Sequence, residues 1–255
     1  VTRFFLDDAR CDYIIFQEMA CADYYFKHCK SYAKTNGIKT ILVIHSENDH
    51  GNMMLDCFHG YGRKDMERRF KKMRNYVYQH IDKVMYISQK AYNESILHVN
   101  KKAIVYNGSP NVDYEFIETK HDIIQLVCVG SMVGRKGQDK IIEAFHLMDE
   151  KLRKNFHVTF VGDGAERPKL QESVRNFGLE KHVSFLGRRN DVANILKDMD
   201  VFIMPSTVEG LPMSAIEALR AGLLLILTDT GGNSELCSND CGLLCTREPE
   251  NILST

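Results

Sequence analysis

The sequence of 255 residues contains no tryptophan and only 5 prolines, and none of its apolar runs approaches the ~20 residues that a membrane-spanning helix needs. The first residues, Val1-Thr2-Arg3-Phe4, lack the long apolar core of a signal peptide. An excess of charge of one sign is also lacking, because 33 lysines and arginines face 34 aspartates and glutamates, a formal net charge of -1. We therefore expect neither an integral membrane protein nor a nucleic-acid partner, and any anion must be bound by a local site.

Eight cysteines are scattered along the chain without a Cys-x-x-Cys pair, and 11 methionines accompany them. This pattern is typical of a reducing compartment rather than of a disulfide framework, so we expect a cytoplasmic protein. Cys237, Cys241 and Cys245 have the spacing of one helical face and could hold a metal there. Because Asp240 and Gly242 interrupt any helix in this segment, we expect no metal site.

Short apolar runs rich in β-branched residues alternate along the chain with segments of helical periodicity. One helical pattern is marked by Met66, Phe70, Met73 and Val77. The expected strands lie at 13–17, 40–45, 83–88, 102–106, 124–130, 157–162, 182–186, 201–205, 223–228 and 242–245. This alternation predicts parallel sheets with helical crossovers, which is the doubly wound α/β class.

A break between two such sheets is predicted near residue 118. The turn residues Asn107-Gly-Ser-Pro-Asn111 are followed by a polar stretch at 115–122 that has no apolar periodicity. We therefore expect two Rossmann-like domains, at 1–118 and 119–255, with six strands in the second and four in the first. Four strands are fewer than such a sheet usually has, and the sequence has no initiator methionine. Both observations predict a fragment whose first domain is truncated.

Polar glycine-containing loops follow several of the expected strands. The first, Gly130-Ser-Met-Val-Gly-Arg-Lys-Gly137, carries Arg135 and Lys136 just before a helix, where free amides and cations favour a diphosphate. Because this loop is neither a Walker sequence nor a GxGxxG, a solvated turn stays an alternative. Gly162-Asp-Gly164 and Gly187-Arg-Arg-Asn-Asp191 follow the next two strands. Together these loops predict a row of polar strand ends along one edge of the sheet.

Two glutamates stand eight residues apart in Val208-Glu-Gly-Leu-Pro-Met-Ser-Ala-Ile-Glu217. Glu209 lies in a loop and Glu217 inside the helix that follows, so they need not share a helix face. One carboxylate could reach the near end of a ligand and the other its far end. The alternative is that Glu209 complements the helix dipole and Glu217 is solvated.

The ordered set of motifs resembles the retaining glycosyltransferases of family 4, which have the GT-B fold of two Rossmann-like domains that face a cleft. The resemblance covers more than 120 residues. Its motifs are Asn107-Gly108, Gly130 with Lys136-Gly137, Val161-Gly-Asp-Gly164, Phe185-Leu-Gly187, Asp200-Val-Phe-Ile-Met-Pro-Ser206, Glu209-Gly-Leu-Pro212, Glu217-Ala-Leu-Arg-Ala-Gly222 and Gly231-Gly-Asn-Ser-Glu235.

The resemblance implies a nucleotide-diphosphate-sugar donor and no separate cofactor. It assigns Glu209 to the transferred sugar and Glu217 to the ribose hydroxyls of the nucleotide. Lys136 would neutralise the diphosphate, and the amides of Gly210 and Leu211 would face the bond between sugar and phosphate.

Other positions of the same site follow from the resemblance. Gly130 and Ser131 begin the diphosphate loop, and Gly187-Arg188 would lie beside the base. The family usually has an arginine where this chain has Ser131, so Arg135 is the candidate to take its place. His45 follows an expected strand where the family has an active-site histidine, although a lone histidine there is more often structural.

A basic run surrounds the apolar stripe at 66–77, with Arg63, Lys64, Arg68, Arg69, Lys71, Lys72 and Arg74. Such a run is usually a solvated face. Because the family often acts on lipid-linked acceptors, a peripheral contact with an anionic membrane is the alternative.

The sequence thus predicts a retaining, metal-independent glycosyltransferase of polysaccharide biosynthesis, which moves a hexose-type sugar to a hydroxyl of a glycan or lipid-linked acceptor. Lys136, Glu209 and His45 are the expected catalytic residues. A nucleotide-sugar epimerase of the same fold is one alternative, against which the Glu209-Gly210-Leu211 pattern argues. A non-catalytic nucleotide-sugar-binding subunit is another, and Ser131 favours it.

Overall fold

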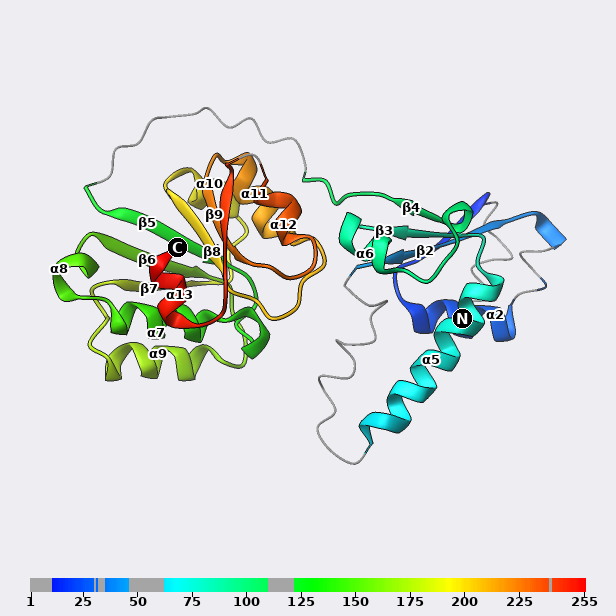
Figure 1. Ribbon diagram of the computed structural model, residues 1–255, viewed down its shortest axis with the longest axis horizontal. Helices are drawn as coiled ribbons and strands as arrows, with labels where there is room; N and C mark the ends of the chain where they lie inside the picture. Colours follow the sequence, from blue (N-terminus) through cyan, green and yellow to red (C-terminus); the bar gives the residue numbers. More distant parts are fainter. Residues whose placement is uncertain (1–10, 30, 32–34, 46–61, 110–121, 239) are drawn as a thin grey trace. The chain divides into compact units, whose positions relative to one another are not determined.

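The computed structural model describes residues 11–29, 31, 35–45, 62–109, 122–238 and 240–255 (Figure 1). The chain divides into two compact units, Val1–Tyr106 and Asn107–Thr255. Each unit holds one parallel sheet, so the predicted α/β class with two sheets is confirmed. The predicted domain boundary at 118/119 lies outside the described residues.

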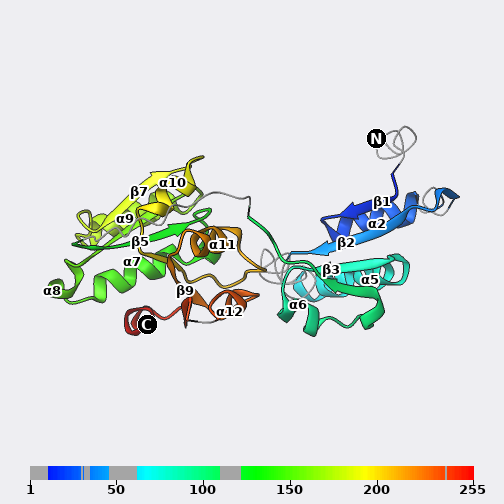
Figure 2. The same ribbon diagram turned by 90° about the horizontal axis from the view of Figure 1, so that it is seen from above.

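The first unit contains a sheet of four parallel strands in the order β1-β2-β3-β4. Figure 2 shows β1, β2 and β3 following one another across this sheet. The strands are β1 (Tyr13–Phe16), β2 (Lys39–Ile44), β3 (Lys83–Tyr86) and β4 (Lys102–Ile104). The helices are α2 (Met19–His28), α5 (Arg63–His80), α6 (Gln89–Glu94) and the 3-10 turn η2 (Val99–Lys101).

The core of the first unit lies between its sheet and the helices α2 and α5. Phe16, Leu42 and Val84 occupy neighbouring register positions on β1, β2 and β3, so their side chains form one row. This row packs in a single buried cluster with Ala22 of α2 and Val77 of α5. The apolar stripe read from the sequence of α5 therefore faces the sheet.

The second unit contains six parallel strands in the order β10-β9-β8-β5-β6-β7. The strands are β5 (Ile124–Val129), β6 (Phe156–Val161), β7 (Val183–Gly187), β8 (Val201–Met204), β9 (Leu224–Thr228) and β10 (Gly242–Cys245). The helices are η3 (Gly134–Lys136), α7 (Gln138–Leu147), α8 (Glu150–Arg153), α9 (Arg167–Asn176), α10 (Val192–Lys197), α11 (Met213–Arg220), α12 (Asn233–Leu236) and α13 (Pro249–Ser254).

Two apolar layers cover the two faces of this second sheet. Successive residues of β5 alternate between them, since Leu126 and Cys128 belong to one buried cluster and Val127 and Val129 to the other. The first cluster lies under α7, α9 and α13, and the second under α10 and α11, which Figure 1 shows on opposite sides of the strands. Burial on both faces explains why these strands read as continuous apolar runs.

Local hydrogen bonds decide where the predicted elements end. The strand expected at 83–88 stops at Tyr86, because Ser88 is the N-cap of α6 and its hydroxyl accepts a hydrogen bond from the amide of Ala91 at 3.2 Å. The expected strand at 242–245 agrees with β10 at both ends. In the part of the chain that the structure describes, no helix is long and apolar enough to cross a membrane.

The strand order of the second sheet creates a switch point between β5 and β8. From β5 the chain moves outward on one side through β6 and β7, and it then returns to pair β8 with the opposite side of β5. Loops that leave two such strands in opposite directions open a crevice at their carboxyl ends, where α/β proteins bind ligands. The candidate site lies at this point.

Candidate functional site

Two loops meet at the switch point, and they carry the residues singled out in the sequence. We call residues 131–137, after β5, the cation turn, and residues 205–212, after β8, the carboxylate loop. The amide of Thr207 donates to the carbonyl oxygen of Arg135 at 2.8 Å. Gly137 has a left-handed φ of 75°, and a Cβ there would lie 2.2 Å from the carbonyl oxygen of Pro205. Only glycine permits this close approach, which brings the two loops together.

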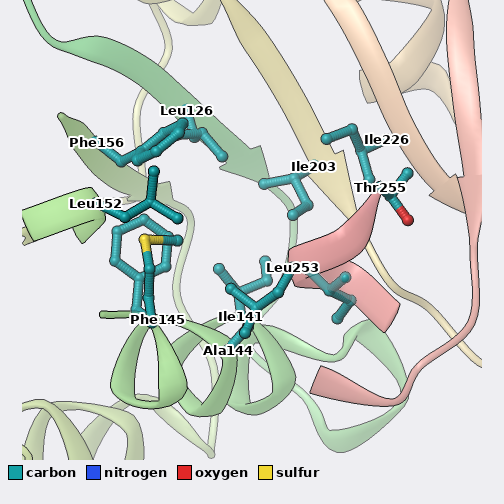
Figure 3. A pocket seen from close by; sticks show the side chains of 12 residues that line it. Leu126, Ile141, Ala144, Phe145, Leu152, Phe156, Ile203, Ile226, Leu253 and Thr255 are labelled. Atoms are coloured by element: carbon teal, nitrogen blue, oxygen red, sulfur yellow. The ribbon is translucent and has the colours of Figure 1, made fainter. Parts of the chain in front are cut away.

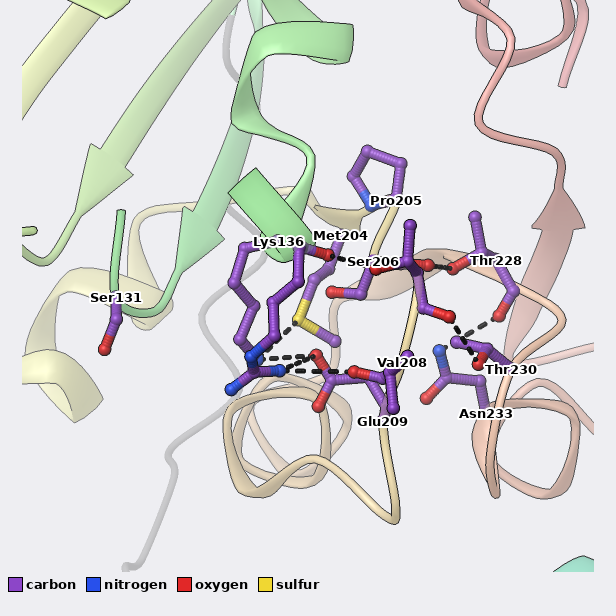
Figure 4. A network of polar contacts seen from close by, with 12 residues as sticks. Ser131, Lys136, Met204, Pro205, Ser206, Val208, Glu209, Thr228, Thr230 and Asn233 are labelled. Carbon is purple, nitrogen blue, oxygen red and sulfur yellow. Dashed lines mark hydrogen bonds and ion pairs between the residues drawn. The ribbon is translucent and has the colours of Figure 1, made fainter. Parts of the chain in front are cut away.

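An ion pair joins the two loops at the centre of the site (Figure 4). Lys136 Nζ lies 2.6 Å from Glu209 Oε1, and the two side chains are only 11% and 7% exposed. Arg135 approaches the same carboxylate oxygen at 3.5 Å and donates to the carbonyl of Val208 at 3.2 Å. Two cations thus share one carboxylate, so the cluster keeps a local excess of positive charge.

The ion pair lies over an apolar floor made by β5 and β8. Lys136 Nζ is 3.7 Å from the sulfur of Met204. Burial, opposed by Lys136 and aided by Glu209, raises the pKa of the Cys128 thiol to about 12, so the thiol stays protonated. Cys128 is therefore a packing residue rather than a nucleophile. With little water around them, the charges of the cluster act more strongly on a ligand than they would at an open surface.

A third segment, residues 228–233 from the end of β9 to the start of α12, packs against the carboxylate loop, and we call it the glycine loop. Gly231 has a φ of 56°, and a Cβ there would lie 2.2 Å from the carbonyl oxygen of Glu209. The amide of Gly232 donates to the carbonyl of Gly210 at 2.5 Å. The glycine loop therefore fixes the backbone on which the Glu209 carboxylate is carried.

Side-chain hydrogen bonds reinforce the contact between these two loops. The Thr228 hydroxyl donates to the carbonyl of Ser206 at 2.6 Å, and the Thr230 hydroxyl to that of Thr207 at 3.2 Å. Asn233, at the start of α12, donates to the carbonyl of Thr228 at 2.9 Å. This network, seen in Figure 4, was missed from the sequence. The glycine pair at 231–232 was the only signal for it there.

Two backbone amides in the carboxylate loop have no acceptor in the part of the chain that the structure describes. Gly210 and Leu211 are buried, and in the described part of the chain no group accepts a hydrogen bond from either N–H. Their carbonyl groups are used, because Gly232 donates to the first and the Asn107 side chain donates to the second at 2.8 Å. Buried amides without partners are rare in proteins and typical of ligand sites.

Glu217 lies within α11, away from the central ion pair. Its side chain is half-buried, and burial raises the pKa of this carboxyl group. Among the residues that the structure describes, no donor forms a hydrogen bond or ion pair with it. Its neighbours Ala215 and Ala218 are buried against the sheet. Glu217 is thus a partly desolvated carboxylate with free acceptor capacity.

The remaining predicted positions are more peripheral. Gly187 ends β7 beside the guanidinium of Arg167, and Arg188 is exposed. Ser131 is exposed at the start of the cation turn, where its carbonyl accepts a hydrogen bond from Gln138 at 3.1 Å. Gly130 lies against the stem of Lys136, with its would-be Cβ 3.7 Å from Lys136 Cε. Figure 4 shows the Ser131 side chain outside the dashed network.

His45 belongs to the first unit, where it follows β2 as predicted. Its side chain is exposed, and its Nε2 contacts the amide oxygen of Gln17, which follows β1. The two residues therefore lie together at the carboxyl ends of neighbouring parallel strands. Of the predicted site residues, the structure brings Arg135, Lys136 and Glu209 together. The catalytic role of His45 stays a prediction.

No metal centre is found within the described ranges, since no group of three or more histidine, cysteine, aspartate or glutamate side chains could hold an ion there. A cavity of about 260 Å³ lies between α7, α13 and the sheet face that they cover (Figure 3). Its walls are apolar side chains such as Leu126, Phe145 and Ile203. A cavity without converging polar groups does not suit a nucleotide or a sugar.

Comparison with known proteins identifies the family of the chain. Residues 113–253 match the family model described as "Glycosyl transferases group 1". The capsular polysaccharide biosynthesis glycosyltransferase CapH of Staphylococcus aureus is 28% identical over 185 residues, which cover 68% of this chain and 51% of CapH. The UDP-Gal:alpha-D-GlcNAc-diphosphoundecaprenol alpha-1,3-galactosyltransferase of Escherichia coli is 35% identical over 118 residues, which cover 44% of this chain and 30% of that protein.

The fold is similar to that of Anabaena HepE, whose structure was solved in complex with UDP. The TM-score is 0.77 at 17% sequence identity, with 99% of this chain and 70% of HepE covered. This likeness confirms the fold. The chain spans only about half the length of CapH.

Proposed function

Because the chain belongs to the group 1 glycosyltransferase family, which has the GT-B fold, we propose that it carries the donor site of a retaining glycosyltransferase. The donor would be a UDP-linked sugar, and the acceptor a hydroxyl of a glycan or lipid-linked glycan in polysaccharide biosynthesis. The observation that carries this proposal is the cluster of Arg135, Lys136 and Glu209 at the switch point, beside two buried amides without partners.

The donor would bind along the carboxyl ends of β5, β7 and β8. Lys136, with Arg135 beside it, supplies positive charge to the diphosphate, and the amides of Gly210 and Leu211 add hydrogen bonds to the same anion. The Glu217 carboxylate accepts hydrogen bonds from the ribose hydroxyls, because it has no competing partner among the described residues. The base lies near Gly187-Arg188, where the exposed guanidinium offers a face for stacking.

Donor binding exchanges one partner of Lys136 for another. In the ligand-free arrangement Glu209 neutralises the lysine at 2.6 Å. A diphosphate that approaches Lys136 releases the carboxylate from part of this attraction. Glu209 is then free to accept hydrogen bonds from hydroxyl groups of the transferred sugar, and the glycine loop still fixes its backbone.

The chemical step follows from this charge arrangement. The bond between the anomeric carbon and the diphosphate oxygen breaks, while a new bond forms to the acceptor oxygen on the same face. The acceptor proton passes to the departing phosphate oxygen. Lys136, Arg135 and the two amides stabilise the charge that develops on the leaving diphosphate. This route needs no enzymic nucleophile, no separate cofactor and no divalent metal, and we assign His45 to the sugar and acceptor side.

We further propose that the first unit contacts an anionic membrane on its cytoplasmic side through α5. Two ion pairs form within this helix, Arg63 with Glu67 at 3.3 Å and Arg69 with Asp65 at 2.7 Å. Four other exposed cations have no ion pair among the described residues, namely Lys64, Arg68, Lys71 and Lys72. Such a face gains electrostatic attraction near acidic lipids.

Vesicle sedimentation tests the membrane contact. The chain should bind vesicles that contain phosphatidylglycerol and should not bind pure phosphatidylcholine. Replacing Lys71 and Lys72 by glutamine should reduce binding, whereas the same change at Lys151 and Lys154, exposed in the second unit, should not. Equal binding to both kinds of vesicle would rule out an electrostatic contact with the membrane.

A panel of nucleotide sugars with analysis of every product tests the proposed reaction. The panel pairs each donor with a glycan and a lipid-linked acceptor, and NMR assigns the anomeric configuration of any product. Transfer with retained configuration supports the proposal. An isomerised free nucleotide sugar would instead show an epimerase, and binding without any conversion would indicate a non-catalytic subunit.

A further inference from the structure

A side chain from near the end of the described chain reaches both loops of the ion pair. Arg247 lies between β10 and α13, and its Nε donates to the carbonyl of Pro205 at 3.0 Å. One terminal nitrogen of the same guanidinium donates to the carbonyl of Gly134, also at 3.0 Å. Pro205 begins the carboxylate loop, and Gly134 lies in the cation turn. Arg247 therefore bonds to the two loops at once.

The position of Arg247 is itself fixed on both sides. Cys245, two residues before it, ends β10 and pairs in register with Thr228 of β9. After it, α13 packs on α7 and buries Ile252 in the core. The amide of Thr246 also donates to the side chain of Asn251 at 2.6 Å. The guanidinium thus extends from a rigid segment of the second unit.

The geometry of an arginine suits this double contact. Its donors point in fixed directions from one plane, so two carbonyls bonded to the same guanidinium are held at a set separation. Asp139, 3.8 Å away at the start of α7, partly balances the charge. The carbonyl of Pro205 also lies close to Gly137, so the middle and the end of the cation turn, Gly134 and Gly137, are both held near this oxygen.

We propose that Arg247 is a positioning residue that keeps the cation turn in register with the carboxylate loop, so that Lys136 and Arg135 meet the diphosphate of the donor. This inference rests on the proposed function. Lys136 is two residues from the bonded Gly134, and the turn between them is a single 3-10 helical turn. Without Arg247, the contacts of Arg135, Lys136 and Gly137 with the carboxylate loop would remain, but the carbonyl of Gly134, at the start of the 3-10 turn, would lose its hydrogen bond and could shift.

Two substitutions and a matched control test the inference. Arg247→Met keeps the apolar stem and removes both hydrogen bonds, whereas Arg247→Lys keeps the charge and can bond to one carbonyl. Arg153→Met is the control, because Arg153 also donates to two carbonyls, of His146 at 3.1 Å and Met148 at 2.6 Å, far from the three loops in sequence. UDP and uridine are the probes, measured by calorimetry and by NMR titration.

Arg247→Met should weaken UDP binding about tenfold and leave uridine binding unchanged, because only the phosphate-binding turn is displaced. Arg247→Lys should recover part of the loss, and Arg153→Met should bind both probes as the parent does. Equal losses for UDP and uridine would show a general structural role and overturn the inference, as would parental affinity in Arg247→Met.

Hydrogen exchange without ligand separates this inference from the proposed function. Two amides report on the loops, those of Lys136, bonded to Val133 at 2.9 Å, and of Thr207, bonded to Arg135 at 2.8 Å. Both should exchange faster in Arg247→Met and at the parental rate in Arg153→Met. If the parent fails to bind UDP, the donor proposal fails, but unchanged exchange alone would overturn the role of Arg247.

Discussion

A Cβ atom on Gly231 would lie 2.2 Å from the carbonyl oxygen of Glu209, so the glycine loop is packed directly against the residue that carries the central carboxylate. Heavy atoms that are not bonded do not approach this closely. Any larger side chain at 231 must therefore move the carboxylate loop or the glycine loop. The position of Glu209 depends on the size of a residue 22 positions further along the chain.

Gly231→Ala should lower the free energy of unfolding by about 3 kcal/mol, since the new methyl group adds crowding to the strain of a left-handed backbone. Gly178→Ala is the matched control, because Gly178 has a similar φ of 65° but nothing within 4 Å of a Cβ. It should cost only about 1 kcal/mol. Urea unfolding of both variants measures the difference, and equal costs would show that the close packing at Gly231 is relaxed in solution.

The buried ion pair predicts strong coupling between its two members. Lys136→Met or Glu209→Gln alone should each lower the unfolding free energy by about 3 kcal/mol, because a buried charge loses its partner at 2.6 Å and Arg135 offers Glu209 only the longer contact of 3.5 Å. The double variant should unfold close to the parent value, since both charges are gone. A double-mutant cycle from urea unfolding measures the coupling. Additive effects of the two changes would mean that the two side chains do not pair.

Position 131 tests how the diphosphate is bound in the absence of the usual arginine. The Ser131 side chain is exposed and lies outside the polar network, so Ser131→Arg should find room and tighten UDP binding about tenfold through a charge-assisted hydrogen bond. Ser131→Ala should leave the affinity within about twofold of the parent, because a serine offers at most one neutral hydrogen bond. Weaker binding by Ser131→Arg would instead mean that Arg135 already occupies the space beside the diphosphate.

The raised pKa of Glu217 predicts a dependence of stability on pH. Burial favours the protonated form, so the parent loses stability as pH rises from the ordinary glutamate value through the raised one. Glu217→Gln has no carboxylate to desolvate, so it should unfold at a higher temperature than the parent at pH ~7. This increase in unfolding temperature should disappear at pH ~4, where the parent carboxyl is protonated. Glu172→Gln, at an exposed position of α9, should show no such gain. A gain that is the same at both pH values would exclude the titration of Glu217 as its cause.

Much of the fold could be predicted because each element has a local signal. The strand Gly242–Cys245 was predicted with its observed bounds, since turn residues surround a short apolar run. The end of β3 was predicted too late, at Ser88 rather than at Tyr86. The hydrogen bond by which Ser88 caps α6 has no distinctive signal in the surrounding sequence. Periodicity reports burial, whereas such boundaries depend on single hydrogen bonds.

The sequence was enough to predict which residues belong to the candidate site, but not which of them contact one another. Sequence could place Lys136 and Glu209 after two strands, but their 2.6 Å contact depends on β8 pairing with β5, which the order along the chain does not reveal. Arg247 gave no signal at all, since it reaches Gly134 across 113 residues and lies in a segment without a motif. Contacts of this kind follow only from the assembled sheet.

Calorimetric titration with UDP of the parent chain, Glu217→Gln and Glu209→Gln tests the proposed donor site most directly, because the two variants differ only in which carboxylate is neutralised. The parent should bind UDP, and Glu217→Gln should bind it about tenfold or more weakly, since hydrogen bonds from the ribose to a charged acceptor are lost. Glu209→Gln should bind UDP at least as tightly as the parent, because UDP lacks the sugar and Lys136 is released. No UDP binding by the parent, or equal losses in the two variants, would contradict the assignment of Glu217 to the nucleotide and Glu209 to the sugar.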